Sequence, residues 1–212
     1  METVAFSRRA GKPEVRLFAK LAARAILLAS LALAGCSGEE PLPYRLVTAA
    51  QPNPFRHAAR FAVSPIEYGK LTVHGEPYER WAARQDQGKL AVFERDKDAM
   101  NQSFSKAFVE RAHAKGFDVV EMGSPDAGPF VVEPIVRDMD PGVTSFEGSA
   151  PSGIKMRVVV RGAGGAPLDE IEVAHAGGVN EQSVGQQHLA GDAAAIAEVI
   201  ADYLAKRVGG PP

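Results

Sequence analysis

The chain has 212 residues, of which 45% are hydrophobic and 24% charged, with 21 Gly, 15 Pro and a single Cys. This is the composition of an ordinary globular protein, and it excludes a collagen-like repeat, a largely disordered chain and a disulfide framework. Residues 1–35 contain six Lys or Arg and two acidic residues, which leaves 18 basic and 24 acidic residues in 36–212, a net charge of −6. We therefore expect no nucleic acid among the partners, because binding it requires a basic surface.

The N-terminus has the three parts of a secretory signal. A basic stretch leads into the apolar run 25–34, and small residues follow that run. Ten apolar residues rise only ~15 Å as a helix, about half the thickness of a bilayer core, so the run is too short for a stable membrane span. We predict a cleaved signal peptide over residues 1–35.

The single cysteine directly follows this signal. The segment Leu33-Ala34-Gly35-Cys36 resembles the lipobox of bacterial lipoproteins, in which Leu, a small residue and Gly or Ala precede the Cys. The resemblance implies cleavage between Gly35 and Cys36, a diacylglyceryl group on the Cys36 thiol, and acylation of the new amine with a chain such as palmitate. Three acyl chains give stable anchoring, because two already suffice.

The same resemblance implies an address in the cell envelope. Ser37 after the cysteine favours sorting to the outer membrane, with the protein facing the periplasm. Two alternatives remain open, which are a plain secreted protein with a chance cysteine and a protein with a buried free thiol.

Residues 36–58 contain four prolines and no sustained hydrophobic period. This pattern predicts a tether that holds the folded body up to ~70 Å from the membrane. Within it, residues 44–47 either pair as a short extended piece or stay in a mobile linker, and Tyr44 could fold back onto the sheet. We predict a single domain over 59–208 and a disordered tail over 209–212.

The expected elements of that domain follow in chain order. They are a strand at 61–68, a short helix within 78–87, a long helix at 89–115, strands at 117–122 and 129–139, a Gly/Ser-rich loop at 143–153, a hairpin of 154–161 with 168–175, and a helix at 189–208. The long helix places Met100, Phe104 and Phe108 on one face and ends at Gly116.

The hairpin gives the clearest strand signal, because hydrophobic and polar residues alternate in both halves. Symmetric pairing about the Gly-rich turn predicts three cross-strand partnerships, which are Val158 with Ile171, Met156 with Val173 and Arg157 with Glu172. The predicted order is β-α-β-β-β-β-α. It favours an α+β fold with two main helices on one face of a mostly antiparallel sheet of about five strands.

Two segments resemble the S-x-x-K nucleophile motif of penicillin-binding proteins, which are Ser103 with Lys106 and Ser152 with Lys155. That family also requires a K-T-G strand, which this sequence lacks. We predict no catalytic residue. A periplasmic hydrolase of unfamiliar type that uses Ser103 and Lys106 remains the alternative interpretation.

The sequence predicts no metal site and no cofactor. Glu110-x-x-His113 occurs once, whereas di-iron bundles need two such motifs and two further glutamates. Asp138-x-Asp140 lacks the remaining ligands of an EF-hand. The segment 162–165 separates two strands and is therefore a turn rather than a phosphate loop. The other histidines are dispersed, and they are His57, His74, His175 and His188.

The body is similar to uncharacterised bacterial lipoprotein families with a small α+β domain. The likeness spans most of 59–208, and it is carried by the segments 61–68, 130–142, 156–160, 168–172 and 203–207 together with the aromatic face of the long helix. It implies a fold and no activity. Tyr78, Trp81 and Phe146 in irregular segments mark either a binding surface or a flap over the core. We expect a non-enzymatic, lipid-anchored accessory or binding protein with an envelope protein as its partner.

Overall fold

The computed structural model describes residues 43–124, 128–145, 148–177 and 186–209. The predicted signal peptide, the cleavage site at Gly35 and Cys36, and Phe146 lie outside these residues. No helix within the described ranges is long and apolar enough to cross a membrane. The buried hydrophobic side chains of the described chain run from Phe55 to Leu204. A chain that begins at Cys36 therefore keeps the whole core.

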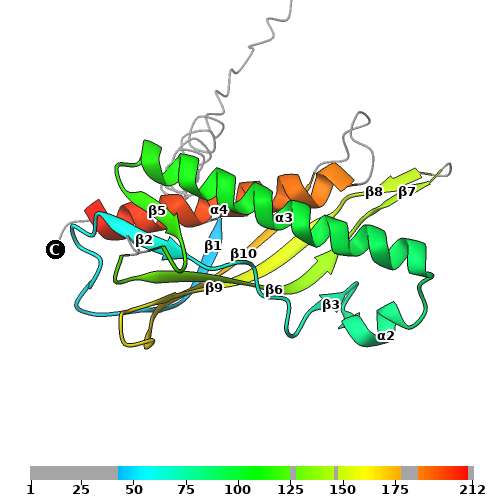
Figure 1. Ribbon diagram of the computed structural model, residues 1–212, viewed down its shortest axis with the longest axis horizontal. Helices are drawn as coiled ribbons and strands as arrows, with labels where there is room; N and C mark the ends of the chain where they lie inside the picture. Colours follow the sequence, from blue (N-terminus) through cyan, green and yellow to red (C-terminus); the bar gives the residue numbers. More distant parts are fainter. Residues whose placement is uncertain (1–42, 125–127, 146–147, 178–185, 210–212) are drawn as a thin grey trace, which may run out of the picture. The chain divides into compact units, whose positions relative to one another are not determined.

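The domain has an α+β fold, as predicted, built on one mixed sheet (Figure 1). Its strands are β1 (Tyr44–Ala49), β2 (Arg60–Val63), β3 (Thr72–Val73), β4 (Glu76–Pro77), β5 (Asp118–Glu121), β6 (Val131–Asp140), β9 (Gly153–Arg161) and β10 (Pro167–Ala176). The helices are α2 (Tyr78–Ala82), α3 (Gln87–Ala114) and α4 (Gln186–Gly209), and β7 (Val143–Ser145) pairs with β8 (Gly148–Ala150) in a separate hairpin. The sheet follows the order β1-β10-β9-β6-β2-β5, with β3 and β4 beside β6.

The two long helices, α3 and α4, lie side by side on one face of the sheet, as predicted (Figure 1). The α3 helix begins after Asp86, whose side chain accepts a hydrogen bond from the Lys89 backbone N–H at 2.8 Å. It ends before Gly116, which has φ +88°, a conformation that glycine adopts without strain. Its buried side chains recur every three or four residues and form one stripe, namely Phe93, Asp96, Met100, Phe104, Phe108 and Ala112. All of them except Asp96 belong to the hydrophobic core.

The hairpin of β9 and β10 has the predicted register. Val158 lies opposite Ile171, Met156 opposite Val173 and Arg157 opposite Glu172. The ion pairs, however, follow the neighbouring strands rather than this register. Arg157 binds the diagonal residue Glu170 at 2.5 Å, and Glu172 binds Arg45 of β1. The presence of β1 beside β10 accounts for the difference.

The domain begins earlier than predicted. The sequence predicts a tether over 36–58 and leaves open whether 44–47 pair or stay mobile. In the structure β1 pairs antiparallel with β10, as in the first of these alternatives, and Phe55, which the sequence places in the tether, is fully buried. The Phe55 ring packs edge-on against Phe130 at a centroid distance of 4.9 Å. The prolines and the missing hydrophobic period conceal this part of the domain, because β1 pairs with a strand more than 110 residues further along the chain and the Phe55 ring packs on Phe130, 75 residues away. At the other end, Gly209 closes α4 rather than starting a tail.

The strand count and order also differ from the prediction. The long pairs β1–β10, β10–β9 and β9–β6 are antiparallel, but β2 is parallel to both β5 and β6. Because α3 crosses over between β2 and β5, these two strands run in the same direction. The strands β3, β4, β7 and β8 have only two or three residues each, too few to show a period. The sequence therefore predicts a loop at 143–153, where the structure has the hairpin of β7 and β8.

Candidate functional site

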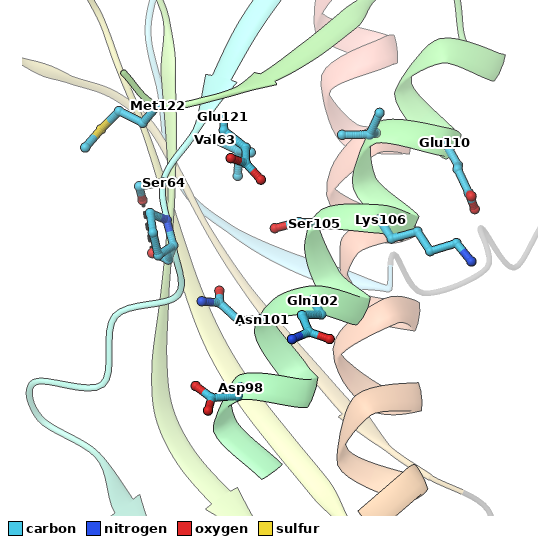
Figure 2. A pocket seen from close by; sticks show the side chains of 12 residues that line it. Val63, Ser64, Asp98, Asn101, Gln102, Ser105, Lys106, Glu110, Glu121 and Met122 are labelled. Carbon is cyan, nitrogen blue, oxygen red and sulfur yellow. Dashed lines mark hydrogen bonds between the residues drawn. The ribbon is translucent and has the colours of Figure 1, made fainter. Parts of the chain in front are cut away.

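A cleft of about 740 Å³ lies between α3 and the carboxyl ends of β2 and β5. Figure 2 shows Asp98, Asn101 and Ser105 on the side of α3 that faces the strands, and Ser64 and Met122 on the opposite wall. The carboxyl ends of parallel strands are the usual place for a binding crevice in an open sheet.

Local geometry opens this cleft. The parallel strands β2 and β5 stop together at Val63 and Glu121, which are register partners. Pro65 follows β2 closely and has no N–H to donate to a neighbouring strand, so the chain leaves the sheet at this point. It pairs with β6 again at Glu67, whose N–H donates a hydrogen bond to the Pro134 carbonyl at 2.9 Å. The side-chain oxygen of Asn101 accepts a hydrogen bond from the Ile66 N–H at 2.9 Å and fixes this bend to α3.

The lining of the cleft combines acidic and apolar groups. Asp98, Glu110 and Glu121 contribute three carboxylates, against one ammonium group from Lys106. Val109 and Met122 are also part of the lining, with 39% and 57% of their surfaces exposed, and they are two of the four large hydrophobic residues that the described surface exposes. An acidic groove with exposed apolar side chains suits a partner that offers basic and apolar groups.

The first S-x-x-K motif lies on α3, where Ser103 and Lys106 are one helical turn apart. Ser105 and Lys106 are part of the cleft lining and Ser103 is not, and the Lys106 side chain points away from the strands (Figure 2). Within the described residues, neither Ser103 nor Ser105 has a lysine, histidine or carboxylate partner. An activated serine needs a base within hydrogen-bonding reach. The geometry thus gives the Ser103/Lys106 interpretation no support.

The second S-x-x-K motif is divided. Ser152 is buried and donates a 2.6 Å hydrogen bond to Asp192, whereas Lys155 is exposed and lies 3.4 Å from Asp138. His175 Nδ1 lies 2.8 Å from the other Asp192 oxygen. In a catalytic triad the histidine stands between serine and carboxylate. Here the Asp192 carboxylate stands between Ser152 and His175. These three side chains therefore connect α4 with the start of β9 and the end of β10.

The remaining predicted candidates do not gather into one site. Among the described residues, no three His, Cys, Asp or Glu side chains are grouped closely enough to hold a metal ion. Burial alone would raise the pKa of Asp138, but hydrogen bonds from Thr72, the Gly75 N–H and Lys155 lower it overall. Glu110 and His113 are exposed on α3, and the segment 162–165 is the turn between β9 and β10. His57, His74 and His188 lie apart along the sequence, on separate segments.

The aromatic candidates behave as a flap over the core. The Tyr78 ring stacks on the buried Phe93 at 5.6 Å, and Trp81 packs against the same ring at 4.7 Å. Burial and the hydrogen bond to Glu94 raise the pKa of Tyr78. The sequence missed the cleft residues Asn101 and Ser105, because only the pairing of β2 with β5 places them opposite a strand end.

Comparisons with known proteins add no family. No protein-family model matches the chain, and no curated protein matches it. Among solved structures, a PelC dodecamer from Paraburkholderia phytofirmans is similar over 74% of this chain and 96% of its own, with 13% identity and a TM-score of 0.42. The crystal structure of an uncharacterised protein is similar over 75% of this chain and 97% of its own, with 8% identity and a TM-score of 0.35.

A putative neuraminyllactose-binding hemagglutinin homolog from Helicobacter pylori is also similar, with 8% identity, coverage of 77% of this chain and 89% of its own, and a TM-score of 0.32. Likenesses this weak transfer neither an activity nor a partner.

Proposed function

We propose that the protein is a lipid-anchored lipoprotein of the cell envelope that acts as a non-enzymatic accessory or binding protein. The observation that carries the proposal is the sequence Leu33-Ala34-Gly35-Cys36 at the end of a secretory signal. Lipidation of Cys36 fixes the domain at a membrane, on the periplasmic side of the outer membrane by resemblance, with an envelope protein as its partner.

The early start of the domain supports a close attachment. Only residues 37–43 separate Cys36 from Tyr44, the first residue of β1. Seven residues span at most ~25 Å even when fully extended. A lipid on Cys36 therefore keeps β1 much nearer to the membrane than a tether ending at residue 58 would.

The cleft beside α3 is the surface that we assign to the envelope partner. Its exposed apolar residues, Val109 and Met122, would be covered in a complex, and its carboxylates would face basic groups of the partner.

Metabolic labelling tests the anchor. Cells that express the full chain are given a clickable palmitate analogue, and the protein is isolated and reacted with a fluorophore. We expect label on the wild type, none on Cys36→Ser, and undiminished label on Ser37→Ala, because residue 37 lies outside the four lipobox positions. A wild-type protein that retains residues 1–35 or carries an unmodified thiol contradicts the proposal.

Site-specific photocrosslinking in intact cells tests the cleft. A photoreactive residue at Gln102, which lines the cleft, is compared with one at Arg95, which is exposed on α3 outside the cleft. We expect one defined adduct from position 102, its loss in Met122→Asp, and no adduct from position 95. Recovery of monomer alone from both positions, with efficient photolysis, argues against a partner at this surface.

A further inference from the structure

A second hollow, of about 560 Å³, lies where the chain enters the domain, and its described lining includes Pro43 and Tyr44. Four cationic side chains from three strands line it: Arg45 of β1, Arg137 of β6, and Lys155 and Arg157 of β9. Glu172 is the single acidic residue in that described lining.

Three of these cations, Arg45, Lys155 and Arg157, lie on the sheet face that the helices leave open. On β9 the residues Ile154, Met156 and Val158 point into the core, so Lys155 and Arg157, at the alternate positions, point the other way. The same alternation places Arg45 on that open face, because it pairs with Glu172, the register partner of Arg157.

The ion pairs of the hollow leave its outer surface positive, because in each pair the cation is the more exposed partner. The exposed side-chain fractions are 73% for Arg45 against 44% for Glu172, 69% for Lys155 against 24% for Asp138, and 36% for Arg157 against 15% for Glu170. Arg137 has no ion pair within the described part of the chain.

The net charge of the domain does not account for the four cations that line this hollow. Residues 43–212 contain 18 Lys or Arg and 22 Asp or Glu, a net charge of −4. An acidic protein that collects four cations around one hollow presents a local site for an anion. Guanidinium groups suit phosphate, because they donate two parallel hydrogen bonds to it.

We propose that this hollow binds the phosphate of an anionic lipid headgroup and so orients the open sheet face toward the membrane. The inference rests on the proposed lipid anchor, which holds Tyr44 within ~25 Å of the acyl chains. Surface potentials decay over about 10 Å at ordinary salt. A tether of at most ~25 Å allows the cations to approach the headgroups, the nearest abundant anions, to within that distance.

The test uses the mature chain, residues 36–212, with Cys36→Ser, so that no lipid contributes to binding. Partitioning onto phosphatidylcholine vesicles with and without 30% phosphatidylglycerol is measured by flotation at low and high salt. We expect at least tenfold stronger partitioning onto the anionic vesicles at low salt, and loss of this preference at high salt.

Arg137→Gln/Lys155→Gln should reduce partitioning onto anionic vesicles about 25-fold, at about fivefold for each cation removed. Folding should persist, because Asp138 keeps its hydrogen bonds from Thr72 Oγ1 at 2.6 Å and the Gly75 N–H at 3.1 Å. Lys70→Gln/Arg95→Gln is the matched control, because it removes the same charge outside the hollow, and it should bind like the parent chain. Glu172→Gln, which frees Arg45, should bind more tightly.

Equal partitioning onto vesicles with and without phosphatidylglycerol overturns the proposal. Two further results would also overturn it: a loss of binding to anionic vesicles in Lys70→Gln/Arg95→Gln as large as in Arg137→Gln/Lys155→Gln, and binding by Glu172→Gln no tighter than that of the parent chain. Inorganic phosphate is the second probe. If it binds the hollow while vesicle composition has no effect, the site serves a soluble phosphate and the lipid assignment is wrong. Because this chain carries no acyl group, its vesicle preference is independent of the palmitate labelling that tests the anchor itself.

Discussion

Phe55 should contribute several kcal/mol to stability although its sequence surroundings suggest a linker. Its ring is fully buried and contacts Phe61 of β2, Phe130 and the Arg207 guanidinium of α4, at 5.9, 4.9 and 5.5 Å. Replacing a buried Phe by Ala typically lowers the free energy of unfolding by about 3–5 kcal/mol. Because separate elements surround the ring, the site cannot collapse easily, and we expect a loss of about 4 kcal/mol for Phe55→Ala.

A loss of that size lowers the melting temperature of a domain of this length by about 8–16 °C. Urea unfolding of the unlipidated mature chain, followed by circular dichroism, measures the free energy directly. Leu46→Ala is the matched control, because Leu46 lies in the same N-terminal segment but is 50% exposed, and it should change stability by less than about 0.5 kcal/mol. If Phe55→Ala behaves like Leu46→Ala, residues 44–58 are a tether after all.

Three further predictions concern buried charge, pH and the alternative chemistry. Asp169→Ala should cost about 3–5 kcal/mol in urea unfolding, because it leaves the largely buried Arg207 without the carboxylate that it binds at 2.8 Å. The hydrogen bond from Arg111 lowers the pKa of Asp202 below its ordinary value of 3.8, so the stability it adds is present above that value and is lost as the pH falls through the lowered pKa. Asp202→Asn should therefore lower the melting temperature by less than about 3 °C at pH 7, and the difference from wild type should vanish once the pH lies below the lowered pKa of Asp202. Ser103→Ala should leave any ester or amide hydrolysis found in a broad substrate screen unchanged, and a selective loss would restore the hydrolase interpretation.

The elements that the sequence predicted well are those in which buried and exposed residues alternate regularly over many positions. The α3 helix was located to within two residues at its N-terminus because its buried stripe repeats every three or four residues and Gly116 ends it. The register of β9 and β10 followed from alternation and a short turn. The cleft did not follow, because Pro65 marks an interruption of the strand at 61–68 but nothing local places Asn101 of α3 beside that interruption.

The amino-acid sequence alone determined the α+β class and the central hairpin, since each depends on patterns of residues that are close together in the chain. The signal peptide and the lipidation of Cys36 also come from the sequence alone, and they stay predictions. Only the tertiary structure decided that β2 runs parallel to β5 and β6, that Phe55 is a core residue, and that Arg45 and Arg137 flank one hollow. These features depend on contacts between segments separated by tens of residues, and such contacts are selected by the burial of the whole core rather than by local preference.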